Sequence, residues 1–180
     1  MARIILGCSA SAALHKGADL ASKLSQAGHE VRAVLTERAA QLIAPQLFEA
    51  LTSNDAYVAE FGDVRKSAMD HIHLSQWAEL ILVAPGGADL VAKLSHGIAD
   101  DLLTTVVLAT PLGVPRLLAP AMNPHMLAHP AVARNLDRLA SDGWRILGSG
   151  AGHMACGVHG QGRLLEPAEI VARVKEVLES

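Results

Sequence analysis

Short apolar runs alternate with amphipathic segments along most of the chain, and each run predicts a buried strand. Five segments have this character: 3–7, 30–35, 80–84, 116–119 and 144–147. The run 80–84 is apolar at every position, which is typical of a central strand covered on both faces. The pattern predicts a mainly parallel sheet of about five or six strands.

Helical periodicity fills the segments between these runs. In 12–27 the apolar positions recur on one side, and Gly28 follows where a helix can end. Further helices are expected at 47–51, 74–79, 90–94, after a turn at 97–101 that Asp100 caps, at 131–139, and from Pro167 onward. Residues 57–65 read as a polar excursion. The alternation predicts one Rossmann-like, three-layer α/β domain over 1–180, with the loops after the strands on one edge.

Composition narrows the classes of function. The net charge is only −3 and no basic run is present, which argues against nucleic acid or an anionic membrane as the main partner. No apolar run reaches the roughly 18 residues that span a bilayer. The apolar stretch before Cys8 is shorter than the core of a signal peptide. We therefore expect a cytoplasmic protein.

Small and polar residues follow the predicted strands. Ser9 and Ser11 lie before a helix whose N-terminus offers N–H groups to an anion. The GxGxxG fingerprint is missing there, which argues against NAD and leaves a mononucleotide phosphate. Thr36 follows the second strand, as a plain helix cap or as a ligand contact. The turn Pro85-Gly-Gly-Ala-Asp89 follows the central strand, and its glycines permit close approach to a ligand.

Two further segments carry candidates for chemistry. Pro120-Ala-Met-Asn123 follows a strand, and Asn123 is either a helix cap or a ligand contact; its company at the strand ends favours the contact. His71 and His73 diverge on a helix, and no further motif completes a metal site, so we expect no metal. His71 is then a general acid or base, or a plain surface histidine.

The glycine-rich segment 148–162 predicts a long mobile loop of the kind that covers a site. Cys156 lies in its middle, which favours an accessible thiol over a buried one. Cys8 lies far away in the sequence and no Cys-x-x-Cys pair is present. A disulfide scaffold and a structural zinc site are therefore both disfavoured.

These motifs, in this order, resemble the flavin-containing cysteine decarboxylases over most of the chain. The resemblance is carried by His71-Ile-x-Leu74 with Trp77-Ala78, Pro85 with Ala88, Gly97-Ile-Ala-Asp100 with Leu102-Leu-Thr104, Pro120-Ala-Met-Asn123, Asn135-Leu136, Ala155-Cys-Gly157 and Gly162-Arg163. It implies a flavoprotein fold that binds FMN at the strand ends, and a homo-oligomer, either a trimer or a dodecamer. It also implies decarboxylation of a cysteine carboxylate, first of all that of 4'-phosphopantothenoylcysteine in coenzyme A biosynthesis.

The resemblance further implies roles for single residues. Asn123 would hold the substrate carboxylate, and His71 would assist the oxidation of the substrate thiol. Met154, Ala155 and Cys156 would form a flap over the substrate, with Cys156 as a proton donor. The expected FMN contacts are Gly7, Ser9, Ser11, Thr36, Gly87, Ala88, Asp89, Thr104 and Ala121.

The chemistry of the reaction explains why a flavin and a proton donor would be needed. A cysteine carboxylate does not lose CO2 readily, because the resulting carbanion has no electron sink. Flavin can oxidise the thiol to a thioaldehyde, and decarboxylation then yields an enethiolate. To reach a saturated aminothiol, reduced flavin returns hydride to one carbon while an acid protonates the other. The presence of Cys156 favours this complete, redox-neutral cycle over one that stops at the enethiol.

Three positions depart from the family pattern. Asp89 and Asp101 stand where asparagine is common, and Val158 stands where an acid is usual. An acid at position 89 would repel a carboxylate or phosphate unless it is paired or protonated. We also expect no fused ligase domain, because the chain ends at Ser180.

These departures leave alternatives open. One is a decarboxylase that acts on the C-terminal cysteine of a peptide. Another is a flavin-binding regulatory subunit without turnover. A relative that forms a prenylated flavin is disfavoured, because the Pro-Ala-Met-Asn and Ala-Cys-Gly signatures are present.

Overall fold

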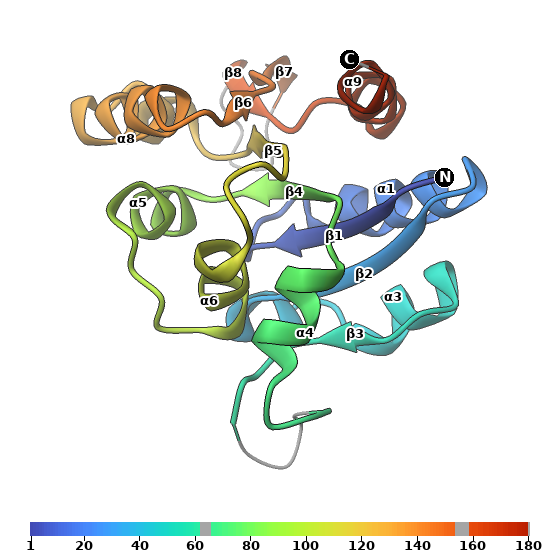
Figure 1. The fold of residues 1–180 in the computed structure, drawn as a ribbon. Coiled ribbons are helices and arrows are strands. Elements are labelled where there is room, and N and C mark those ends of the chain that lie inside the picture. Colours follow the sequence, from blue (N-terminus) through green and yellow to red (C-terminus); the bar gives the residue numbers. More distant parts are fainter. Residues whose placement is uncertain (62–65, 154–158, 180) are drawn as a thin grey trace.

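The computed structural model describes residues 1–61, 66–153 and 159–179. Six strands form a sheet that is parallel throughout, in the order β3-β2-β1-β4-β5-β6 (Figure 1). The predicted, mainly parallel α/β fold is therefore confirmed. The strands are β1 (Arg3–Cys8), β2 (Glu30–Leu35), β3 (Ala56–Tyr57), β4 (Leu80–Gly86), β5 (Arg116–Pro120) and β6 (Arg145–Ile146).

Helices cover both faces of this sheet. On one face lie α1 (Leu14–Gln26), α3 (Pro45–Thr52) and α9 (Pro167–Leu178). On the other lie α4 (Asp70–Trp77), α5 (Ala88–His96), α6 (Leu102–Ala109) and α8 (Pro130–Ser141). Two single-turn helices, α2 (Glu37–Ala40) and α7 (Pro124–Leu127), follow directly after β2 and β5.

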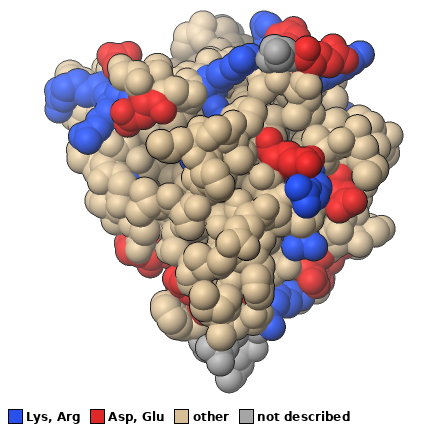
Figure 2. Space-filling view, in the orientation of Figure 1, with Lys and Arg blue, Asp and Glu red and all other residues tan. Residues whose placement is uncertain are grey.

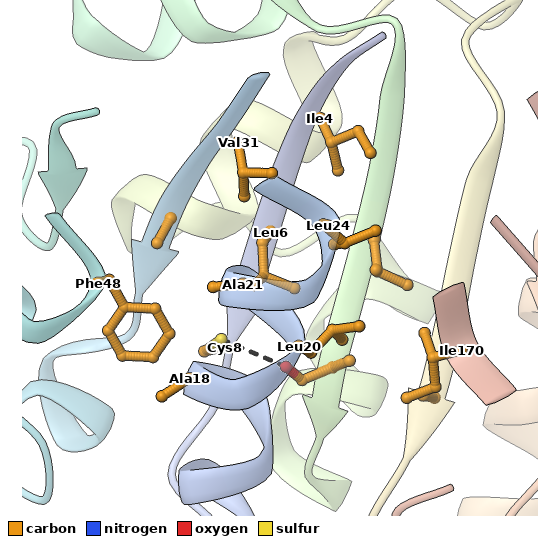
Figure 3. Packing of buried hydrophobic residues seen from close by; sticks show 14 of the residues in the cluster. Ile4, Leu6, Cys8, Ala18, Leu20, Ala21, Leu24, Val31, Phe48 and Ile170 are labelled. Carbon is orange, nitrogen blue, oxygen red and sulfur yellow. Dashed lines mark hydrogen bonds between the residues drawn. The ribbon is translucent and has the colours of Figure 1, made fainter. Parts of the chain in front are cut away.

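The core is divided by the sheet into two aliphatic clusters. In β1, Ile4 and Leu6 belong to one cluster and Ile5 to the other, as the alternation of side chains along a strand requires. Figure 3 shows Leu20 and Leu24 of α1 packed over the first of these faces. Burial of each Leu or Ile side chain stabilises the folded state by about 1.5–3 kcal/mol. The strand ends therefore extend from a well-packed core.

The glycine-rich segment near the C-terminus differs from its prediction. From Gly150 onward its described residues form not a loop but two antiparallel strands, β7 (Gly150–His153) and β8 (His159–Arg163). The prediction was wrong because glycine gives no alternating pattern and is rare in strands. The predicted flap residues Met154, Ala155 and Cys156, and Val158 beyond them, lie outside the described residues.

Two smaller predictions also need correction. Residues 57–65 were expected to be irregular, but Ala56–Tyr57 forms the short edge strand β3 beside β2. Asp100 was expected to cap α6, but Asp101 is the N-cap: its carboxylate accepts from Thr104 N at 2.8 Å. Asp100 instead pairs with Lys93 at 2.8 Å.

Among the described residues, no helix combines the length and the apolar composition that a membrane span requires.

Candidate functional site

The strand order reverses between β1 and β4, because the helices that follow these strands pack on opposite faces of the sheet. Open α/β sheets bind ligands outside the carboxyl ends of the strands at such a switch point. The turn after β1 and the turn after β4 meet here. The predicted edge of strand ends therefore has its centre between these two turns.

Ser9 joins the two turns. Its buried hydroxyl donates to Pro85 O at 2.9 Å and accepts from Gly87 N at 2.7 Å. A hydroxyl has one hydrogen to donate, so a phosphate oxygen would compete with Pro85 for it. Ser11 Oγ accepts from Ala13 N at 3.2 Å at the start of α1. Contacts of both serines with a cofactor stay predictions.

The Ser9 hydroxyl thus acts as a clamp between the two turns, and Gly87, which has no side chain, leaves an opening beside it. A Cβ at this position would lie 3.1 Å from both Ser9 Oγ and Asp89 Oδ1, which is a tight contact. Gly87 is also the N-cap of α5, and within the described part of the chain no side chain caps this helix. Its first-turn N–H groups and its positive dipole end are thus suited to an anion. These features fit the phosphate-bearing cofactor that the resemblance implies.

A charged pair spans the same edge of the sheet. Arg38 in α2 lies 3.7 Å from Asp89 in α5, and both side chains are exposed. The partner that an acid at position 89 requires is therefore present. Thr36 caps α2, with its hydroxyl accepting from Ala39 N at 3.2 Å. The cap interpretation of Thr36 is thus confirmed, and its contact with a cofactor stays a prediction.

Other expected cofactor contacts have packing or capping roles. A Cβ on Gly7 would lie 2.7 Å from Leu103 Cδ1, so this glycine makes room for α6. Thr104 is buried and completes the capping box of α6. Ala121 donates its N–H to Gly86 O at 3.0 Å, which places it beside the switch point; Ala88 begins α5 there.

Asn123 caps the short helix α7, because its Oδ1 accepts from His125 N at 2.8 Å. The cap interpretation is therefore confirmed, and a contact with a substrate carboxylate stays a prediction. The side chain is half-buried after the carboxyl end of β5. The cap fixes its orientation there.

The hairpin of β7 and β8 packs against this segment. Met122 N donates to Gly162 O at 3.0 Å. A Cβ on Gly160 would lie only 3.0 Å from Pro124 Cγ, so glycine permits the close approach of β8 to α7. The glycine-rich segment therefore contacts the Asn123 loop through β8.

His71 stands apart from the switch point, on α4. Its Nδ1 lies 2.8 Å from Oε1 of Glu60, a residue that follows β3 by three positions. No described contact joins His71 to Ser9, Gly87 or Asn123. His73 is exposed, and the described residues hold no group of three His, Cys, Asp or Glu side chains placed to bind a metal.

Two residues of this region were not identified from the sequence, Glu60 and Arg38. Each is an acid or a base in a polar stretch, and its partner lies at least eleven positions away. An alternating or helical pattern does not report such contacts. For Arg38 the available signal was its position shortly after the predicted strand 30–35, whereas Glu60 follows β3, which was not predicted.

Cys8, at the end of β1, is fully buried and contacts Ala84 O at 3.2 Å through Sγ. Burial raises the pKa of this thiol far above its usual range. Cys8 is therefore a packing residue rather than a nucleophile or an acid.

Comparison with known proteins identifies the family. Residues 1–179 match the family model described as Flavoprotein. The chain is 44% identical over 168 residues to the coenzyme A biosynthesis bifunctional protein CoaBC of Bacillus subtilis (strain 168), covering 93% of this chain and 41% of that protein. It is 39% identical over 169 residues to CoaBC of Escherichia coli (strain K12), covering 94% and 41%. The chain thus spans about two fifths of the length of these relatives.

Solved structures agree over nearly the whole chain. A PPC decarboxylase variant complexed with pantothenoylaminoethenethiol is 27% identical, with a TM-score of 0.86 and 99% of each chain covered. SpaF, an FMN-dependent cysteine decarboxylase, is 31% identical, with a TM-score of 0.78 and 97% of each chain covered. These matches confirm the resemblance found in the sequence. The chain belongs to the Flavoprotein family, among the flavin-dependent cysteine decarboxylases.

Proposed function

We propose that this chain is an FMN-dependent carboxy-lyase that decarboxylates 4'-phosphopantothenoylcysteine to 4'-phosphopantetheine in coenzyme A biosynthesis. The observation that carries the proposal is the 44% identity to CoaBC over 93% of this chain. The structural similarity to a PPC decarboxylase over 99% of both chains supports it. At the switch point, the Ser9 turn and the N-terminus of α5, which no described side chain caps, support FMN as the cofactor.

The residues that would hold FMN lie around the two turns of the switch point. The turn with Ser9 and Ser11 and the first turn of α5 would receive the phosphate, because both end at helix N-termini. Gly87 and Ala121 would lie against the ring system, since neither carries a bulky side chain. When bound, FMN supplies a two-electron acceptor and donor for the substrate.

Three side chains would act on the substrate. Asn123 would hold the carboxylate and orient it until it leaves as CO2. His71 would take up the thiol proton, and Cys156 would return a proton to carbon at the end of the cycle. Met154 and Ala155, which are neighbours of Cys156 in the chain, would contact the substrate.

A homo-oligomer, trimeric or dodecameric, fits the distribution of charge. Figure 2 shows a broad face over α4 and α6 with few charged residues. Large apolar side chains are exposed on these helices and in the segments beside them: Phe61, Met69, Leu108 and Leu112. Contiguous apolar surfaces of this kind mark interaction sites. His71 lies apart from the switch point, and we propose that it acts on substrate bound to a neighbouring subunit.

A visible spectrum and product analysis test the proposal. We expect a yellow protein that releases CO2 from phosphopantothenoylcysteine and forms the saturated aminothiol, identified by mass spectrometry. With Cys156→Ser the enethiol should accumulate instead. The chain offers a matched control in Cys8→Ala, which should still form the saturated product. A colourless protein that does not bind FMN would contradict the proposal.

A second candidate substrate is the C-terminal cysteine of a peptide, because the 31% identity to SpaF, an FMN-dependent cysteine decarboxylase, supports the chemistry without fixing the molecule that carries the cysteine. The same assay separates the two, because a peptide ending in cysteine can be offered beside phosphopantothenoylcysteine. Turnover of the peptide alone would favour this candidate. FMN binding without turnover of either substrate would instead indicate a regulatory flavoprotein.

A further inference from the structure

Glu60 and His71 form a short contact that is largely shielded from solvent. Glu60 Oε1 lies 2.8 Å from His71 Nδ1, and the two side chains are 19% and 21% exposed. Nδ1 itself is buried, and the N–H direction does not align fully with the carboxylate. The distance between the two atoms is nevertheless that of a charge-assisted hydrogen bond.

Both ends of this contact are held in place. Glu60 follows the edge strand β3 by three residues, so it lies on the carboxyl side of the sheet. His71 is the second residue of α4, and the start of that helix is fixed by the buried Asp70. The Asp70 carboxylate accepts from Lys66 N at 3.0 Å and from Ser67 N at 2.9 Å.

The nearby charges leave the imidazole as the partner of Glu60. The ammonium group of Lys66 is already paired with Glu49 at 3.0 Å and with Asp55 at 3.1 Å. Among the described residues, no Lys or Arg lies within ion-pair distance of Glu60. Within the described part of the chain, the charged partner of this carboxylate is therefore the histidine.

We propose that Glu60 is a positioning residue for His71, which holds a proton on Nδ1 and leaves Nε2 to exchange protons with the substrate. This inference rests on the proposed function. The partner of one imidazole nitrogen decides which tautomer is present and how the ring is oriented. When Nε2 takes the thiol proton, the imidazolium is stabilised by the carboxylate. Nε2 later returns that proton to the sulfur of the saturated product, and Glu60 takes no part in the transfer itself.

The test is Glu60→Gln, which keeps the shape of the side chain but removes its charge. We expect kcat to fall about 10- to 100-fold, as for the loss of a charge-assisted hydrogen bond, with KM and FMN affinity within about twofold. Nitrogen-15 NMR of the His71 ring should show a smaller population of the Nδ1–H tautomer. Glu49→Gln is the matched control, because Glu49 pairs with Lys66 in the same region and should leave kcat and the tautomer unchanged.

The outcomes separate this inference from the proposed function. Unchanged kcat and tautomer in Glu60→Gln would overturn the inference, and so would equal losses in Glu60→Gln and Glu49→Gln. Full activity of His71→Asn would overturn the role of the histidine itself. The NMR measurement needs no turnover, so it tests Glu60 even where the wild-type protein proves inactive on phosphopantothenoylcysteine.

Discussion

Replacement of Ser9 by alanine should weaken the clamp between the two turns of the switch point. The buried hydroxyl makes two hydrogen bonds, to Pro85 O and from Gly87 N. Pro85 O keeps the N–H of Ser9 at 3.0 Å, so Gly87 N–H is the group that loses its partner. A buried N–H without a partner costs about 1–3 kcal/mol, and the second lost bond about 1 kcal/mol. We expect a loss of about 2–4 kcal/mol, or about 6–12 °C in Tm for a chain of this size.

Thermal and urea denaturation of the FMN-free protein measure this loss. Ser11→Ala is the matched control, because Ser11 lies in the same turn and accepts one bond, from Ala13 N at 3.2 Å. This control should lose only about 0.5–1 kcal/mol. Equal losses in the two variants would refute the clamp. Flavin fluorescence should then show weaker FMN binding for Ser9→Ala, because the Ser9 hydroxyl no longer holds the turns after β1 and β4 together.

Three further substitutions test single contacts. Asp101→Ala should cost about 1 kcal/mol in urea denaturation, because α6 loses its cap, whereas Asp101→Asn should be nearly neutral; equal losses would contradict the cap. Lys16 lies 2.6 Å from Glu166 and lowers the pKa of its carboxyl. A carboxyl whose pKa is lowered in the folded state adds stability above its unfolded-state pKa, and this stability is lost as the pH falls. Lys16→Met should therefore flatten the fall in Tm between about pH 5 and pH 3. Parallel curves of Tm against pH for the variant and the wild type would refute this. Asn123→Asp should keep the cap and the Tm but lower decarboxylation at least about 100-fold, since a second negative charge would face the carboxylate; full activity would exclude that contact.

The parts of the fold that could be predicted are those in which burial sets a pattern. In β4 all seven residues are buried, and this burial appears in the sequence as an unbroken apolar run. β3 has two residues and owes its order to pairing with β2, which leaves no local pattern. In β7 and β8 the backbone pairing holds the strands together, and glycine has no side chain to alternate. Backbone pairing that leaves no side-chain pattern is therefore what the periodicity missed.

The candidate site divides in the same way. Its location could be predicted, because the ends of parallel strands meet at one edge whatever their loops contain. The contacts within it could not. Ser9 meets its two partners across 76 and 78 residues, and Glu60 meets His71 from outside the helix that carries the histidine. Adjacent acids pose a similar problem at α6, since only the phase of the helix decides that Asp101, and not Asp100, reaches Thr104.

Asn123 shows why a structural role and a functional role need not be alternatives. As the N-cap of α7 its carboxamide oxygen is held by His125 N, and the preceding residue, Met122, is tied to Gly162 of β8. Both bonds form within the chain, so the amide is oriented before any substrate arrives. Groups fixed in this way lose little freedom on binding, which is how a site lowers the cost of orientation. The cap would therefore orient Asn123 for the proposed contact with the substrate carboxylate, and the separate bond from Met122 N to Gly162 O would couple that contact to the hairpin beside it.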